Sequence, residues 1–307
     1  MIEPAVKKIL FLFITLIVPM LTLFSQNTGQ AAYNERSNEG QYKIYFQEAN
    51  DHLGKYEFWE SIKSCEAALR YKPDDFLVRA MMCLDYYEIA ERLDVHKPDD
   101  KEEKIELYSK MNTIADEGIR CAPDRGECYF MRGLANARMS TTKGIMSQLF
   151  TAQQIEKDWL IAVDRKSDYV TPNGENLQAS SCLALGVYYR LCPTFFLIRW
   201  FFGISGDLNK SVDYCRRAYE LDSTRIEIVK EYGVALITSG LDRENKKDIE
   251  EGKEYLRKVA SLPLRLQTDT IDIAHSKMLL DNISLCPGYS RDEQQDVSEE
   301  SYKKTQQ

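Results

Sequence analysis

The stretch Leu185-Gly186-Val187-Tyr188-Tyr189 decides the fold of this chain, together with Ser211, Cys215 and Ala218 further along. The stretch has the spacing Leu-Gly-x2-Tyr. Further along, the small residue Ser211 is followed by Cys215 four positions later and by the small residue Ala218 three positions after that. Glycine or alanine at such positions lets two antiparallel helices approach closely, while larger side chains fill the groove to the neighbouring pair. The stretch therefore predicts two helices that pack against each other.

The closing half of this pattern recurs at the same offsets in three earlier places. These are Ser61, Cys65, Ala68 and Pro73; Met111, Ala115, Gly118 and Pro123; and Ile155, Trp159, Ala162 and Ser167. The opening half recurs at Arg132-Gly133 and at Tyr232-Gly233, and a further closing half near Gly252 is ambiguous by one residue. A series of matches separated by turn residues is specific for a helical repeat. The small residues expected at helix contacts are Ala68, Gly133, Ala162, Gly186, Ala218 and Gly233.

This series resembles the tetratricopeptide repeat family over about Tyr42–Leu266. The resemblance implies an all-α fold of irregular tetratricopeptide-like antiparallel helix pairs that form a solenoid. We expect four to five pairs and then one amphipathic helix over Asp269–Leu285. The closing positions 73, 123, 167 and 223 lie 50, 44 and 56 residues apart, against about 34 in the standard unit. The surplus falls around Asp94–Lys101, Ser140–Ala152 and Leu191–Gly206, which predicts long inner helices and inserted loops on one face, often a binding face.

Composition and motifs argue against nucleic-acid binding and against catalysis. Binding to nucleic acid requires a basic surface that displaces counterions from the phosphates. The net charge of −8 and the pI near 5.2 argue against such a surface. The three histidines, His52, His96 and His275, lie too far apart in sequence to indicate a metal or catalytic cluster. The sequence contains no phosphate-binding, dinucleotide, zinc-protease or nucleophile-elbow motif. We therefore expect no enzyme activity, no cofactor, no metal and no nucleic-acid partner.

The first 25 residues predict an export signal. Lys7-Lys8 precede a mostly apolar run from Ile9 to Phe24, which is short for a membrane span and suits a signal-peptide core. Cleavage near Ser25 or Ala31 and retention of 9–24 as an uncleaved membrane anchor are both open. Residues 26–40 are expected to be a linker, 41–288 the helical domain and 289–307 a disordered tail. The expected location is the periplasm or the cell envelope.

Eight cysteines follow the predicted signal, and two interpretations of them stay open. Several occupy positions where a helix contact needs a small apolar residue, which favours buried thiols. An even count in an exported chain also allows one or two disulfides.

The insertion Cys192–Ile204 is unusually rich in aromatic side chains. It can cap the core, line a cavity for an apolar ligand, or contact a membrane or another protein. We expect it to lie at the mouth of the array with its aromatic side chains facing an internal apolar space. The candidate ligand or partner contacts are Phe195, Phe196, Trp200, Phe201, Phe202, Tyr188 and Tyr189.

A narrower resemblance involves Leu185-Gly186-x2-Tyr189-Arg190, Pro193, Gly206-Asp207-Leu208-x2-Ser211 and Ala218-x-Glu220-Leu221. This run is similar to the T-component family of TRAP transporters, although no lipidation cysteine follows the apolar run. The resemblance implies a periplasmic accessory protein with a central pore, a solute-binding protein as partner and a small, apolar organic ligand. The alternative is a general protein-interaction scaffold in the cell envelope, and homo-oligomers are compatible with both.

Overall fold

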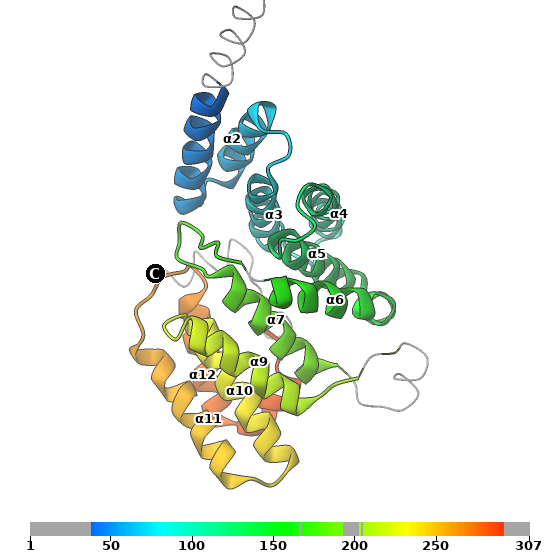
Figure 1. The fold of residues 1–307 in the computed structure, drawn as a ribbon. Helices are drawn as coiled ribbons and strands as arrows, with labels where there is room; N and C mark the ends of the chain where they lie inside the picture. Colours follow the sequence, from blue (N-terminus) through cyan, green and yellow to red (C-terminus); the bar gives the residue numbers. More distant parts are fainter. Residues whose placement is uncertain (1–37, 166, 193–202, 204, 292–307) are drawn as a thin grey trace, which may run out of the picture.

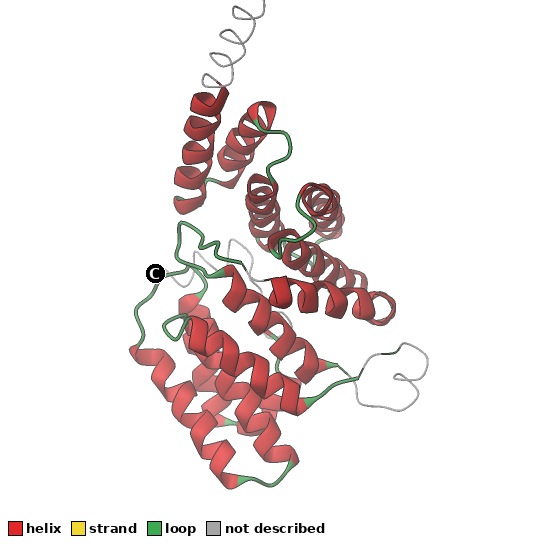
Figure 2. Cartoon of the chain, viewed as in Figure 1, coloured by secondary structure: helices red, strands yellow, loops and turns green. Residues whose placement is uncertain are grey.

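A computed structural model of the chain describes residues 38–165, 167–192, 203 and 205–291, with only the backbone at 145–149 (Figure 1). After a first helix over 38–54, the α-helices are α2 Phe58–Tyr71, α3 Phe76–Glu91, α4 Pro98–Cys121, α5 Glu127–Lys143, α6 Ile145–Arg165, α7 Leu177–Leu191, α9 Leu208–Leu221, α10 Ile226–Asp242, α11 Lys246–Lys258 and α12 Asp269–Asp281. Two short 3₁₀ helices follow α11 and α12: η1 Val259–Ser261 and η2 Ile283–Gly288. Within these residues there is no strand beyond an isolated bridge between Val170 and Asn176 (Figure 2).

Consecutive helices pack in pairs, as the repeated spacing predicts. The helix over 38–54 pairs with α2, α3 with α4, α5 with α6, α7 with α9, and α10 with α11 (Figure 1). The predicted closing halves coincide with the second helix of each pair: α2, α4, α6, α9 and α11. The prediction of an all-α array of irregular tetratricopeptide-like pairs is therefore confirmed.

The turns between pairs carry the side chains that start the next helix. Asp75 caps α3, because its carboxylate accepts hydrogen bonds from the amides of Leu77 at 2.9 Å and Val78 at 3.0 Å. Asn176 caps α7 and Asp207 caps α9 in the same way. These caps satisfy amides that the first helical turn leaves without partners, so the local sequence determines where each helix begins.

The small residues of the repeat lie where helices approach each other. Ala68, Ala162 and Ala218 are all buried. A Cβ atom added to Gly133 would lie 2.5 Å from the Trp159 ring nitrogen, so α5 and α6 could not pack as closely with alanine there. Gly186 faces Cys215 on α9, and Gly233 faces the Gly252 carbonyl on α11. All eight cysteines are free thiols; Cys121 is exposed, Cys192 is half-buried and the others are buried.

The first expected insertion is a short loop that leads into a long helix, and the second is helical on both sides of one glycine. α4 begins at Pro98 and runs for 24 residues. α5 and α6 are separated only by Gly144, whose φ of 111° allows the sharp turn. Around Ser140–Ala152 the extra residues therefore take the form of long helices, since they continue both α5 and α6. Most of the third insertion, 193–202 and 204, lies outside the described residues.

The longest described connection between pairs is one that the spacing did not indicate. Residues 167–176 join α6 to α7, and Pro172 packs against Gly54 of the first helix. Asn173 donates a hydrogen bond to the Leu53 carbonyl across 120 positions of sequence. This loop therefore ties the middle of the array back to its N-terminal pair.

Both ends of the folded body differ from the predicted boundaries. The first helix is already formed at 38, inside the expected linker 26–40. At the other end Tyr289 is fully buried, so the body extends through Arg291 and past the expected boundary at 288. The predicted signal or anchor lies outside the described residues, as does the tail from 292. Among the helices that are described, none has the length and apolar character needed to cross a bilayer.

Candidate functional site

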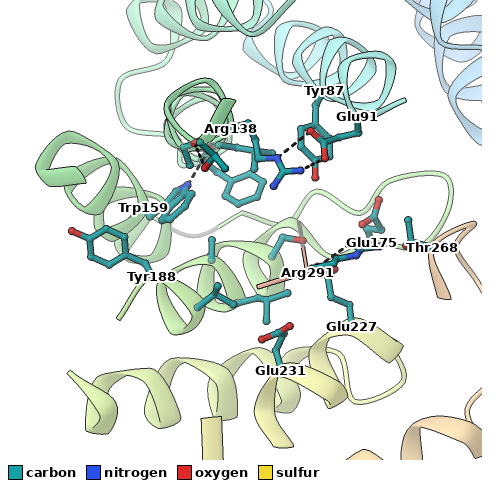
Figure 3. A pocket seen from close by; sticks show the side chains of 18 of the residues that line it. Tyr87, Glu91, Arg138, Trp159, Glu175, Tyr188, Glu227, Glu231, Thr268 and Arg291 are labelled. Carbon is teal, nitrogen blue, oxygen red and sulfur yellow. Dashed lines mark hydrogen bonds and ion pairs between the residues drawn. The ribbon is translucent and has the colours of Figure 1, made fainter. Parts of the chain in front are cut away.

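The inner side of the array encloses a chamber of about 690 Å³ (Figure 3). Its walls come mainly from the first helices of successive pairs, α3, α5, α7 and α10, with contributions from α6, the loop 167–176 and the segment after α12. Pockets that hold drug-sized ligands typically measure about 300–1,000 Å³. The chamber is therefore large enough for an organic ligand or a short stretch of polypeptide.

One wall of the chamber is apolar. It is formed by Phe130 and Leu134 of α5, Ile155 and Trp159 of α6, and Leu183, Val187 and Tyr188 of α7. The indole of Trp159 is fixed, since its N–H donates to the Phe130 carbonyl at 3.3 Å and its ring meets Tyr188 edge-on at 6.3 Å. Fixed aromatic side chains bind apolar groups at low entropic cost.

An ion pair also stands on this side of the chamber. The guanidinium of Arg138 on α5 binds the carboxylate of Glu91 at the end of α3 (Figure 3). Lys104 lies 3.7 Å from the same carboxylate. Tyr108 donates a further hydrogen bond to Glu91. Burial alone would raise the pKa of Glu91, but Arg138 and Lys104 outweigh burial and hold it well below its usual range. Glu91 is therefore a fixed negative charge beside an apolar surface.

The opposite wall carries charges in matched pairs. Arg225 is almost fully buried, and its guanidinium lies 2.9 Å from Glu175 of the loop and 2.8 Å from Glu227 of α10. Arg291 binds Glu227 at 3.2 Å, and Figure 3 shows Glu175, Glu227 and Arg291 across the chamber from the Glu91–Arg138 pair. Because these carboxylates already bind guanidinium groups, the wall is ordered before any ligand arrives.

Glu88 is the chamber residue whose charge changes near neutral pH. Burial raises the pKa of its carboxyl to about 7, although Arg92, 3.1 Å away, opposes the shift. Its side chain is 28% exposed, and Glu88 lines the chamber. Proton uptake there alters the charge of the chamber between about pH 6 and pH 8.

The structure separates the residues that the sequence proposed as ligand contacts. Tyr188 lines the chamber. Tyr189 does not, because its hydroxyl donates to Glu156 at 2.6 Å and its ring stacks on Tyr214 at 5.8 Å. Phe195, Phe196, Trp200, Phe201 and Phe202 lie outside the described residues.

Sequence reasoning missed most of the chamber. Trp159 was singled out only as a large residue in the repeat, and Phe130 was not singled out at all. Charged residues inside otherwise apolar helical runs, such as Arg138, Arg190 and Glu231, were the available signal. In the described part of the chain, no group of His, Cys, Asp and Glu side chains is placed to hold a metal ion.

Comparisons with known proteins add little about identity. No protein-family model matches the chain, and no curated protein matches it. Among solved structures it is similar to the crystal structure of MamA protein, with 16% sequence identity and a TM-score of 0.40 over 74% of this chain and 97% of that one. These comparisons do not support the resemblance to the TRAP T-component family. The description of this chain as a tetratricopeptide-like protein therefore rests on its own helix pairs.

Proposed function

We propose that this chain is an exported, non-enzymatic binding protein that holds an extended segment of a partner protein in its chamber. The observation that carries the proposal is the chamber itself, about 690 Å³ in volume and lined by the first helices of four successive pairs. Each first helix presents a short row of side chains, so the chamber can contact several consecutive residues of an extended chain.

The two walls suit a polypeptide because they differ in chemistry. The apolar wall around Phe130 and Trp159 can accept apolar side chains, while the charged wall around Glu227 can accept main-chain amides and polar groups. The carboxylates of Glu91 and Glu227 are held by guanidinium groups. Carboxylates held in this way suit recognition better than proton transfer, which is consistent with a binding role.

A second candidate is an accessory role in TRAP-type solute uptake, with a small apolar ligand in the same chamber. The apolar wall favours this candidate, since Leu134, Ile155 and Val187 offer no hydrogen bonds from their side chains. Both candidates assume a location in the periplasm or the cell envelope, which the N-terminal sequence predicts.

Filling the chamber with one side chain tests both candidates. Ala184 lies on α7 at the chamber wall, and Ala184→Trp would occupy part of the space. Ala260 is exposed on η1, so Ala260→Trp makes the same change away from the chamber. Each variant is tested with a displayed library of random peptides and with the neutral apolar dye N-phenyl-1-naphthylamine.

Peptides enriched by the wild type and by Ala260→Trp, but not by Ala184→Trp, would support the peptide-binding proposal. If the dye binds the wild type and Ala260→Trp but not Ala184→Trp, and no peptides are enriched, the small-ligand candidate replaces the peptide-binding proposal. If neither probe distinguishes the two variants, and both variants melt as the wild type does, the chamber is not a binding site.

A further inference from the structure

The described residues that line the chamber carry one carboxylate more than they carry guanidinium groups. They include five glutamates and four arginines. Each of these arginines forms an ion pair with a different glutamate of the lining, and the pair of Arg190 with Glu231, 2.7 Å apart, is the fourth. The fifth glutamate is Glu88 of α3, whose partner Arg92 is not among the lining residues. Glu88 is therefore the carboxylate of the chamber that has no matching cation within the lining.

Arg92 neutralises Glu88 only in part. Its Nη1 lies 3.1 Å from one carboxylate oxygen of Glu88 and 2.7 Å from the Glu88 carbonyl oxygen. Its Nη2 donates to Gln267 at 2.7 Å, and its guanidinium lies over the Phe58 ring, 4.5 Å from the centroid. Burial raises the pKa of Glu88 to about 7 in spite of this arginine. The ionised carboxylate would therefore gain from a second cation on its chamber side.

Tyr56, which also lines the chamber, has a backbone conformation that side chains rarely adopt. Its φ is 62°, at the position after the first helix where glycine or asparagine usually ends a helix. The amide of Tyr56 donates to the Leu53 carbonyl at 3.0 Å, and the amide of Glu57 donates to the His52 carbonyl at 2.9 Å. Backbone strain of this kind is typical of residues that contact ligands.

The side chain of Tyr56 is half-buried and has bonding capacity left over. Its ring meets Phe58 edge-on at 6.1 Å, and its hydroxyl forms no hydrogen bond with the described part of the chain. Burial raises the pKa of this hydroxyl, and the carboxylates of Glu88 and Glu175 raise it further. The phenol therefore stands in a negative field, where its ring face and its oxygen can both receive a cation.

We propose that Tyr56 and Glu88 form a subsite of the chamber for the cationic side chain of a lysine or an arginine in the bound segment. The carboxylate supplies the charge that the lining leaves unmatched, and the phenol supplies a ring face and a hydrogen-bond acceptor. The inference rests on the proposed function and names the chemistry of one residue of its ligand.

The first experiment compares two small probes of equal chain length by isothermal titration calorimetry of the full chain. The cationic probe n-octylammonium imitates a lysine side chain, and n-octanol is its neutral counterpart. At pH 8, above its pKa, Glu88 is ionised. The wild type should bind octylammonium at least about tenfold more tightly than octanol. Equal affinity for the two probes, or binding of neither, would overturn the inference.

Glu88→Gln should remove this preference and leave the affinity for octanol unchanged, which shows that the chamber is intact. Glu254→Gln makes the same change on the exposed side of α11 and should bind both probes as the wild type does. A Glu88→Gln chain that still prefers octylammonium as strongly as the wild type does would contradict the assignment of Glu88.

A matched pair of glycine variants separates a binding role of Tyr56 from a structural one. Glu244 follows α10 with a φ of 55°, and the amide after it likewise donates to a helix carbonyl, that of Gly240 at 2.8 Å. Glu244 is exposed, so Glu244→Gly relieves the same strain away from the chamber and should leave both affinities unchanged. Tyr56→Gly should lose the preference for octylammonium while its thermal midpoint stays within about 4 °C of the wild-type value. If Tyr56→Gly instead melts well below the wild type and keeps the preference, the ring serves packing and the inference is wrong.

This inference and the proposed function can fail separately. Enriched peptides that contain no excess of lysine or arginine, together with equal affinity for the two probes, would remove the subsite and leave peptide binding in place. A preference for octylammonium that depends on Glu88 and Tyr56 would support the subsite even where the library yields no peptides.

Discussion

At the scale of single residues, Gly133 shows how close packing depends on one missing side chain. The indole of Trp159 lies across the Gly133 position, and Trp159 cannot retreat without losing its hydrogen bond to the Phe130 carbonyl. An added methyl group would therefore separate α5 from α6 or push the indole out of position in the chamber wall.

We predict that Gly133→Ala lowers the free energy of unfolding by roughly 1–3 kcal/mol through overpacking. The matched control is Gly40→Ala in the first helix, where an added Cβ meets no atom within 4 Å. The control should be neutral or stabilising by up to about 1 kcal/mol, because alanine favours helix more than glycine. Urea unfolding of both variants measures the difference, and equal stability would show that the contact is not tight.

Asp85 on α3 is a second residue with a measurable consequence. It is fully buried, and one carboxyl oxygen accepts a hydrogen bond from Ser61 at 2.7 Å. The other oxygen has no hydrogen-bond partner among the described residues. Burial raises the pKa of this carboxyl to about 8, while the bond from Ser61 opposes the shift. At neutral pH the protonated form is favoured.

The unfolded chain binds that proton more weakly, since a solvated aspartate has a pKa of about 3.9. The contribution of Asp85 to stability is therefore complete below about pH 4 and is lost as the pH rises from there through 8. We predict that Asp85→Asn raises the free energy of unfolding, relative to the wild type, by roughly 4–5 kcal/mol more at pH 8 than at pH 4. The exposed control Asp281→Asn should show no such dependence. Parallel stability curves for both variants would contradict the prediction.

At the scale of elements, surplus sequence has two different outcomes in this chain. Between α5 and α6 it extends helices, because the residues around Gly144 keep favouring helix on both sides of a single left-handed glycine. Between α6 and α7 it forms the loop 167–176, where Asn173 and Pro172 contact the first helix. Length alone does not distinguish these outcomes, since both depend on what the extra residues can contact.

The aromatic insertion Cys192–Ile204 supports a prediction at the same scale. Leu191 and Cys192, where α7 ends and the insertion begins, line the chamber. We predict that a variant with serine at Phe196, Trp200 and Phe202 binds N-phenyl-1-naphthylamine more weakly than the wild type and keeps the same thermal midpoint. Loss of several kcal/mol of stability would instead identify the three as core residues. If dye binding and the thermal midpoint are both unchanged, these three residues contribute neither to ligand binding nor to stability.

At the scale of the whole molecule, the curvature of the array creates the chamber. The Glu91–Arg138 pair and the Glu175–Arg225–Glu227 cluster come from different pairs of helices and line the same chamber. Figure 3 shows Glu175 and Glu227 across that chamber from Glu91 and Arg138. The loop 167–176 and the segment Cys286–Arg291 line two further sides of that space. Binding at this site is therefore a property of the assembled array and not of any one pair.

Export is also a property of the whole chain, and it is predicted by Lys7-Lys8 and the apolar run that follows. A fusion of residues 1–40 to a reporter that is active only after export should be active, and replacing Leu16 and Ile17 by arginine should abolish the activity. A reporter that stays inactive in the cytoplasm would refute export. Mass spectrometry of the purified protein separates cleavage near Ser25 or Ala31 from a retained anchor.

The sequence alone determined the helix pairs and their order. The spacing of small residues such as Ala68, Gly186 and Ala218 is local, and helix contacts within a pair involve residues close in sequence, so periodicity is sufficient to find them. The caps at Asp75 and Asp207 follow the same logic. Local spacing therefore also predicts that Tyr188 lies on a helix. It does not predict whether the Tyr188 side chain lines the chamber or packs in the core.

Only the tertiary structure decided the chamber and the position of the segment Cys286–Arg291. Arg138 and Glu91 are 47 positions apart, and Arg190 and Tyr289 are 99 positions apart. The pairing of buried arginines with carboxylates depends on the rotation between successive helix pairs. Many weak packing contacts together determine that rotation, and no local sequence pattern encodes them. Tyr289 shows the consequence, because the sequence predicts it to begin a disordered tail, yet its side chain is fully buried and bonded to Lys230 of α10 and His275 of α12.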